Sequence, residues 1–226
     1  MLHRAQVQIQ ARKPVPSIVR STAHVSLESS LETMGAMMHF ARNNEIYGDD
    51  EPADYLYKVV SGAARTYKVL ADGRRQVAAF YLPGDMFGFE AGKVHALSAE
   101  AISDSRILIV KRSAVMDLAV RDPNIAKQLW TMTGREVQRA HDHVLILIKS
   151  AEERVAGFLV DMARRSSDAN AVRIPMSRQD IADYLGLTIE TVSRMLTLFQ
   201  KSAAIALPSA RCVEIRNRAA LNRLNA

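Results

Sequence analysis

Residues 177–200 constrain the fold more than any other stretch of this chain, because two helix-start signals flank a glycine. Ser177 and Asp180 have the spacing of a capping box, and Thr188 can cap a second helix. Gly186 allows the chain to reverse between the two helices. Apolar residues with helical spacing give the helices a buried face, at Ile181, Ala182, Leu185, Val192, Met195, Leu196 and Phe199. The segment therefore predicts a helix-turn-helix.

The outer face of the second helix carries polar groups in its first two turns. Glu190 can accept a hydrogen bond from the amino group of cytosine, and Arg194 can donate two hydrogen bonds to guanine. The methyl groups of Ile189 and Thr191 can contact thymine. Because the major groove of DNA admits a narrow, polar helix start, we predict that this helix reads base edges.

Groups suited to the DNA backbone surround this helix. Its N-terminal end favours phosphate, and residues 205–207 and 212–215 predict a hairpin that forms a wing. The last 58 residues carry eight basic and four acidic side chains, which favours an anionic partner, although solubilising charge explains the excess equally well. The residues expected on the DNA backbone are Ser177, Arg178, Thr188, Thr191 and Arg211.

A chain of 226 residues that is 48% apolar and 24% charged can bury one large core or two modest ones. Its longest aliphatic run, residues 144–148, is far shorter than the roughly 18 residues that cross a bilayer, and the first residues lack a signal-peptide apolar region. We expect a cytoplasmic protein without a membrane partner. The single cysteine, Cys212, cannot by itself form an intrachain disulfide, a zinc cage or a four-thiolate iron-sulfur site.

Short β-prone runs separated by glycine occupy residues 45–110. We predict strands at 55–60, 64–70, 76–82 and 106–110, the first three joined as successive antiparallel hairpins. Strands at this spacing favour a small sandwich or roll. Before them, residues 1–28 lack periodicity and are expected to be a disordered leader. A lead-in helix is predicted from the spacing of Met34, Met37, Met38 and Phe40.

A long helix is predicted from Asp122-Pro123, where proline suits a first helical turn, to about Lys149. Its apolar positions alternate three and four residues apart, which is the spacing of helices that pack on a partner helix. The stripe consists of Trp130, Thr133, Val137, Ala140, Val144 and Leu147. It can pack either on the chain's own β-domain or on a second copy. We predict the second arrangement, a parallel homodimer.

A further capping box, at Ser150 and Glu153, starts the C-terminal part of the chain. From there the pattern predicts a helix, a short strand, a helix, a tight turn, a helix and a hairpin. The expected fold is α+β in four parts. They are a leader (1–28), a β-roll sensor-like domain (29–121), a dimerisation helix (122–149) and a winged helix-turn-helix domain (150–226).

Three stretches resemble the CRP/FNR superfamily of bacterial transcription regulators, most of all its FixK branch, and the resemblance covers about residues 30–220. "MSRQDIADYLGLTIETVSRML" is similar to its winged helix-turn-helix, and "YKVVSGAAR" and "FYLPGDMFGF" resemble its cyclic-nucleotide-type β-roll. The resemblance implies a dimeric activator whose activity is set by its abundance. It also implies that the dimer binds TTGA-N6-TCAA-like palindromes and contacts RNA polymerase. It places Glu190, Ser193 and Arg194 on base-reading positions. Ile189, where CRP-type helices have arginine, points to the same half-site.

The same resemblance bears on what the β-roll binds. Cyclic-nucleotide binders of the superfamily carry an arginine, then serine or threonine and alanine, where this chain has Leu97-Ser98-Ala99. Leucine offers no donor to a buried phosphate, so cyclic AMP is not expected to bind. Glu90 also lies one place later than the glutamate of the binders. The leader contains no cysteine for an iron-sulfur cluster, and we expect no cofactor.

Several side chains keep alternatives open. Haem ligation through His95 would make the chain a gas-sensing regulator, although a histidine in a loop is more often simply exposed. His141 and His143 point about 200° apart on a helix and cannot easily share a metal ion. Some FixK-type regulators have a redox-active cysteine where this chain has Ser193. Cys212, on the predicted wing, can substitute for it or be a packed strand thiol.

A rival of another class is a cyclic-nucleotide-regulated enzyme subunit. The sequence contains neither a nucleophile elbow nor a phosphate-binding glycine loop, and the winged helix accounts for the terminal residues. We therefore predict a DNA-binding regulator without catalytic residues.

Overall fold

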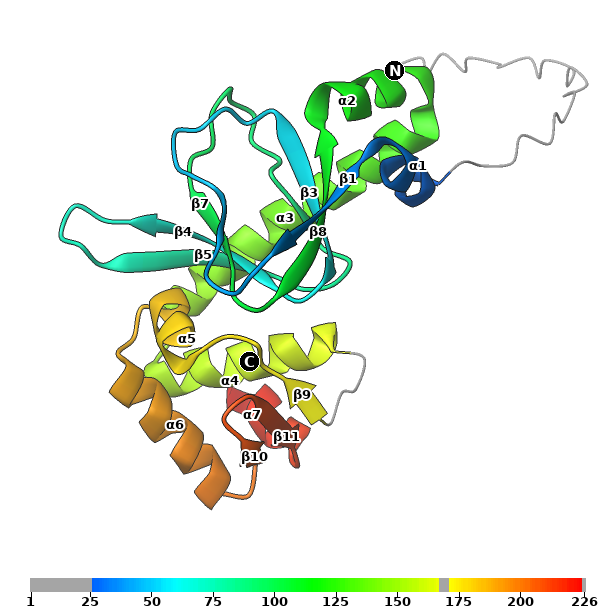
Figure 1. The fold of residues 1–226 in the computed structure, drawn as a ribbon. Helices are drawn as coiled ribbons and strands as arrows, with labels where there is room; N and C mark the ends of the chain where they lie inside the picture. Colours follow the sequence, from blue (N-terminus) through cyan, green and yellow to red (C-terminus); the bar gives the residue numbers. More distant parts are fainter. Residues whose placement is uncertain (1–25, 167–170, 225–226) are drawn as a thin grey trace, which may run out of the picture.

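The computed structural model describes residues 26–166 and 171–224, so most of the predicted leader lies outside the described residues. In Figure 1, a β-rich domain lies above a smaller, mostly helical domain, and a long helix runs along the first domain toward the second. Among the helices of the described segments, none combines the length and the apolar character needed to cross a membrane.

Two four-stranded antiparallel sheets form the β-rich domain, as the prediction of a roll requires. The first sheet has the order β1 (Ala36–Phe40), β8 (Ser105–Lys111), β3 (Tyr55–Ser61) and β6 (Met86–Phe87). The second has the order β2 (Glu45–Tyr47), β7 (Ser98–Ala101), β4 (Ala64–Val69) and β5 (Arg75–Tyr81). The four predicted strands correspond to β3, β4, β5 and β8, and β4 and β5 form the expected hairpin.

The prediction of a hairpin between residues 55–60 and 64–70 is wrong. Strand β3 pairs with β6 and β8, whereas β4 pairs with β5 and β7 in the other sheet. The chain crosses between the sheets at Gly62, whose φ is 83°. A Cβ atom there would overlap the backbone carbonyl of Asp104 and the hydroxyl of Ser105. Glycine therefore allows a sheet-to-sheet crossing here, not a tight hairpin turn.

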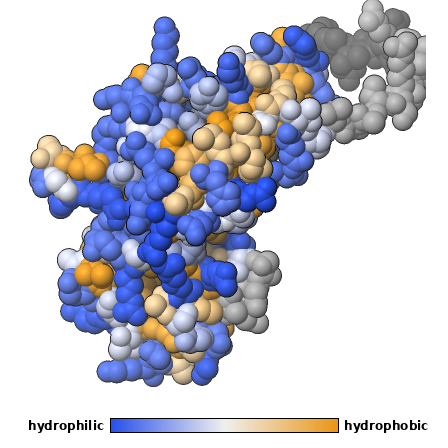
Figure 2. Space-filling model, in the orientation of Figure 1, coloured by the Kyte–Doolittle hydropathy of each residue, from blue (hydrophilic) through white to orange (hydrophobic). Residues whose placement is uncertain are grey.

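The lead-in segment is part helix and part strand. Helix α1 (Leu27–Met34), capped by Ser26, ends at Gly35, and the predicted helical positions Met37, Met38 and Phe40 lie on β1 instead. Pairing with β8 decides this, since Met37 lies opposite Leu108 in the sheet. Met34, Met37 and Met38 are 39–48% exposed, and Figure 2 shows an apolar area where Figure 1 draws β1.

After α2 (Arg112–Arg121), the predicted long helix is α3 (Pro123–Leu147). The Asp122 side chain caps it by accepting a hydrogen bond from the backbone N–H of Asn124 at 2.8 Å. Within the predicted stripe, Leu147 is half-buried and the other members are exposed, with Trp130, Val137 and Val144 at 81%, 50% and 61%. The alternative that this stripe packs on its own β-domain is therefore wrong.

The C-terminal domain follows the predicted order of elements, with one addition. It contains α4 (Ala151–Arg165), β9 (Ala171–Arg173), α5 (Arg178–Leu185), α6 (Ile189–Lys201), β10 (Ile205–Ser209), β11 (Cys212–Ile215) and α7 (Arg218–Leu224). Helix α7 was not predicted. The three strands form one antiparallel sheet in the order β10-β11-β9.

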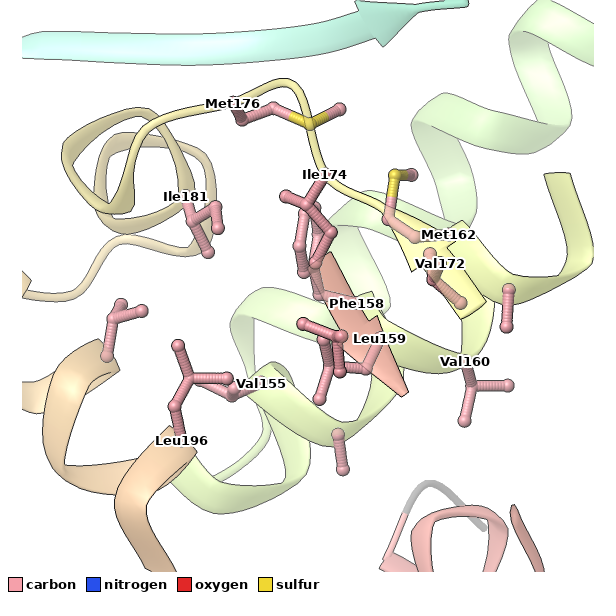
Figure 3. Packing of buried hydrophobic residues seen from close by; sticks show 14 of the residues in the cluster. Val155, Phe158, Leu159, Val160, Met162, Val172, Ile174, Met176, Ile181 and Leu196 are labelled. Atoms are coloured by element: carbon pink, nitrogen blue, oxygen red, sulfur yellow. The ribbon is translucent and has the colours of Figure 1, made fainter. Parts of the chain in front are cut away.

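Helix α4 carries the core on which the two helices of the helix-turn-helix rest. In Figure 3, Val155 of α4 lies beside Leu196 of α6, and Ile181 of α5 points toward the same cluster. Phe158 and Leu159 are 1% exposed. Burying a side chain of this size contributes roughly 1.5–3 kcal/mol, so the packing of α4 fixes how α6 is presented.

Candidate nucleic-acid interface

Each helix of the helix-turn-helix begins and ends as its sequence predicts. The Ser177 hydroxyl accepts a hydrogen bond from the backbone N–H of Asp180 at 3.1 Å, and an Asp180 oxygen accepts from the N–H of Ser177 at 3.0 Å. Helix α5 ends at Gly186, which has a left-handed φ of 62° that favours glycine. The Thr188 hydroxyl then caps α6 by accepting from the N–H of Thr191 at 3.2 Å.

Helix α6 separates an apolar face from a polar one. Val192, Leu196 and Phe199 are buried, and Met195 is half-buried. The predicted base-reading residues lie on the other side: Ile189, Glu190 and Arg194 are exposed, and Ser193 is half-buried. The structure therefore brings these four side chains together on one accessible face.

The residues predicted to contact the DNA backbone border this face. Arg178 and Thr188 are exposed at the starts of α5 and α6, whereas Ser177 and Thr191 are half-buried. The hydroxyl of Thr188 also donates to that of Thr191 at 3.2 Å. Arg178 makes a contact across the motif, since its Nη1 donates to Ser193 Oγ at 3.1 Å.

The predicted wing places its turn beside the start of α5. Arg211 is exposed in the turn between β10 and β11, and its carbonyl accepts from the N–H of Ile174 at 2.9 Å. A small internal space is lined by Ala210 of this turn together with Arg178 of α5. Cys212 is half-buried on β11.

A charge cluster that the sequence did not reveal holds α5 against the roll. Arg65 of β4 lies 2.6 Å from Asp180 and 2.9 Å from Glu100. Arg75 of β5 lies 2.7 Å from both Asp180 and Asp183. Burial alone would lower the pKa of Arg75, but the hydrogen bond and charge of Asp183 and the charge of Asp180 raise it. More than 100 residues separate the arginines from the two aspartates of α5.

Aromatic contacts join the domains next to these charges. The ring of Phe80 on β5 lies 6.3 Å from that of Phe158 and 5.1 Å from that of Tyr184. His143 of α3 stacks on Tyr184 with a centroid distance of 3.9 Å, and its Nε2 lies 2.7 Å from the Tyr184 carbonyl oxygen. Burial lowers the pKa of His143, and hydrogen bonds to the carbonyls of Tyr184 and Ala78 offset part of this shift.

The residues considered for binding haem or a cyclic nucleotide lie inside the roll. The expectation that His95 is more often exposed is wrong: the residue is fully buried, and its ring stacks on Tyr47 with a centroid distance of 3.6 Å. Its Nδ1 lies 2.9 Å from an oxygen of Glu90. Ser98 accepts a hydrogen bond from the N–H of Asp49 at 3.1 Å. In residues 26–166 and 171–224, no three His, Cys, Asp or Glu side chains are grouped to hold a metal ion.

A β-roll, a long helix with an exposed apolar stripe and a winged helix-turn-helix define a class of protein, the DNA-binding transcription regulators built on an effector-type roll. The family models agree with this class. Residues 37–122 match the cyclic nucleotide-binding domain, and residues 153–224 match the Crp-like helix-turn-helix domain. The chain belongs to the CRP/FNR family.

Individual relatives narrow the comparison to the FixK type. The chain is 52% identical to the nitrogen fixation regulation protein FixK of Azorhizobium caulinodans, over 85% of this chain and 80% of the relative. The FixK of Rhizobium meliloti is 44% identical, over 80% and 82%. The solved structure of FixK2 from Bradyrhizobium japonicum is 49% identical with a TM-score of 0.82, and the match covers 85% of this chain and 98% of that one. This chain is a FixK-type transcription regulator.

Proposed function

We propose that this regulator binds palindromic DNA resembling TTGA, six bases and TCAA. The observation that carries the proposal is the exposed face of α6, where Glu190 and Arg194 lie together with Ser193 and Ile189. A guanine in TTGA offers two acceptors to the Arg194 guanidinium, and the paired cytosine offers an amino group to the Glu190 carboxylate. Arg178, which borders this face, and Arg211, exposed in the wing turn, supply charge for the phosphates.

The protein acts as a homodimer joined by α3. Five of the six stripe residues are exposed in the single chain, which leaves an apolar seam over several helical turns without a partner. A second copy of α3 covers such a seam with the same residues. Two α6 helices then enter successive major grooves about 34 Å apart, which matches the two halves of a palindrome.

The dimer acts on promoters in the cytoplasm, where it contacts RNA polymerase and activates transcription without cyclic nucleotide or iron-sulfur cofactor. Leu97 supplies no donor for a phosphate, and Ser98 is held by the backbone of Asp49. His95 is fully buried and stacks on Tyr47, so a haem could reach its ring only if the surrounding core opened. We therefore favour a DNA-binding regulator over the gas-sensing and enzyme-subunit alternatives, and expect no Soret band in the purified protein.

Arg194→Ala tests the base-reading face. The change should weaken binding to the palindrome by about 1–3 kcal/mol and relax the preference at one G·C pair of each half-site. Gel-shift titrations on the palindrome and on duplexes changed at each half-site position measure both effects. Lys201→Ala is the matched control, because it removes an exposed cation from the last turn of α6. Equal losses on all duplexes for Arg194→Ala would contradict the proposal.

A further inference from the structure

Arg178 is the first residue of α5, yet it is hydrogen-bonded to the neighbouring helix α6. Its Nη1 donates to Ser193 Oγ at 3.1 Å. The two aspartates of α5 are engaged elsewhere, Asp180 by Arg65 and Arg75, and Asp183 by Arg75. A guanidinium has five N–H donors, so the contact with Ser193 leaves several that can reach a phosphate.

The hydroxyl of Ser193 differs from a comparable hydroxyl on its own helix. Thr197 donates its hydroxyl proton to the carbonyl four residues earlier, which belongs to Ser193. The Ser193 hydroxyl instead bonds to a donor, Arg178, and no acceptor for its own proton lies within hydrogen-bond distance in the described residues. One lone pair of its oxygen is therefore occupied by a cation, while its proton remains available toward the exposed face of α6.

We propose that Arg178 is a positioning residue that makes Ser193 a hydrogen-bond donor toward DNA. This inference rests on the proposed function, because it concerns how the same face reads bases. A guanidinium can only donate, so it occupies one of the two lone pairs of the Ser193 oxygen. Its positive charge also disfavours a second donor at that oxygen and turns the hydroxyl proton away, so the contact favours donation by Ser193. Ser193 then selects a base with an acceptor in the major groove, such as thymine O4 or guanine O6 or N7. It disfavours cytosine, whose amino group is a donor.

Arg178 thereby links a phosphate contact to a base contact. In Arg178→Ala, the Ser193 hydroxyl is free to rotate, to accept from a base, or to bond to the backbone carbonyl one turn earlier. The loss of Arg178 should therefore change which base is preferred, and not affinity alone. Removal of a residue that contacts only phosphate would weaken binding to all sequences alike.

Competition gel shifts with the full-length protein test this assignment. The probes are the palindrome and duplexes changed symmetrically at each half-site position, and the variants are Arg178→Ala, Ser193→Ala and the double variant. We expect both single variants to lose discrimination by about 3- to 10-fold at the same base pair, which corresponds to one hydrogen bond. The double variant should lose no more than either single one, because the two residues act as a unit.

Arg211→Ala is the control, because it removes an exposed cation from the wing without touching Ser193. It should weaken binding to every duplex and leave discrimination unchanged. Equal thermal unfolding transitions establish that the variants are folded. If Arg178→Ala keeps the wild-type discrimination at the Ser193 position, or if the two losses multiply, the role of Arg178 is overturned. Failure of the wild type to prefer the palindrome over a scrambled duplex would instead overturn the proposed function.

Discussion

Both carboxylate oxygens of Asp180 are engaged, and they serve different parts of the molecule. Oδ2 accepts from the N–H and the hydroxyl of Ser177, which closes the capping box of α5. Oδ1 accepts from Arg65 and Arg75 of the roll. Asp180 is 5% exposed, so these bonds replace the water that a buried carboxylate would otherwise lose. A residue that looks from the sequence like a local helix cap is therefore also a contact between domains.

His143 provides a pH-dependent test at the same scale. Burial lowers its pKa in the folded chain, so the unfolded chain binds the proton more readily. The stability contributed by neutral His143 is thus present above about pH 6.5 and is lost as the pH falls below it. His143→Gln keeps an amide donor for the Tyr184 carbonyl but does not titrate.

We expect the free energy of unfolding, measured by urea denaturation, to fall more between about pH 7 and pH 5 in the wild type than in His143→Gln. Other titrating groups are common to both proteins and cancel in this comparison. Parallel pH dependences would show that His143 is not the responsible group.

At the scale of elements, α3 offers the sharpest test. Val137→Asp together with Val144→Asp places two charges in the seam that we assign to the dimer. Burying these charges is costly, so the dissociation constant of the dimer should rise at least about 100-fold. Sedimentation equilibrium measures it. Thr131→Asp with Gln138→Asp is the control and adds the same charge. Thr131 and Gln138 are exposed and each lies one position after a stripe residue, Trp130 or Val137, so this variant should leave the dimer intact. A dimer that survives the valine changes removes α3 from the interface.

The elements that could be predicted are those with local signals. Helix α5 has its capping box and Gly186, and α3 has Asp122-Pro123, so both lie where the sequence indicates. Strand β6 has two residues and β2 three, too few for a period-two pattern. Helix α7 was missed although Asn217 caps it, since its side chain accepts a hydrogen bond from the N–H of Ala220 at 3.0 Å. One of the two partners of β3 is β8, nearly 50 residues later, and only the closed roll reveals this pairing.

At the scale of the whole molecule, the exposed polar face of α6 and the contact between the domains differ in how far they could be predicted. The face of α6 follows from helical periodicity, because Glu190 and Arg194 are four residues apart. The contact with the roll depends on Arg65 and Arg75, which look like ordinary strand cations. No sequence pattern connects these arginines with α5, because they are far from it in the sequence and meet it only in the folded chain.

Arg75→Ala tests that contact. The change removes the partner of Asp183 and one partner of Asp180, and should cost about 1–3 kcal/mol of stability in urea denaturation of the full-length chain. Arg74→Ala is the matched control, because the Arg74 side chain is 76% exposed and pairs with Asp72. It should change stability by less than about 0.5 kcal/mol.

Reversing the pair should recover the part of the contact that joins Arg75 to Asp183, but not the bond between Arg75 and Asp180. Arg75→Asp combined with Asp183→Arg keeps one charge of each sign at this contact, so the combination should be more stable than either change alone. If Arg75→Ala and Arg74→Ala have the same small effect, the cluster does not hold α5 against the roll.

The shared use of Asp180 limits how freely the two halves of this protein can be exchanged with those of its relatives. A chimera that grafts this C-terminal module onto a roll lacking arginines at positions 65 and 75 would leave the inner oxygen of Asp180 without its partners. The reciprocal graft would leave Arg75 without either aspartate and Arg65 with Glu100 alone. Successful hybrids therefore need both arginines and both aspartates transferred together, as a single inherited unit that crosses the domain boundary.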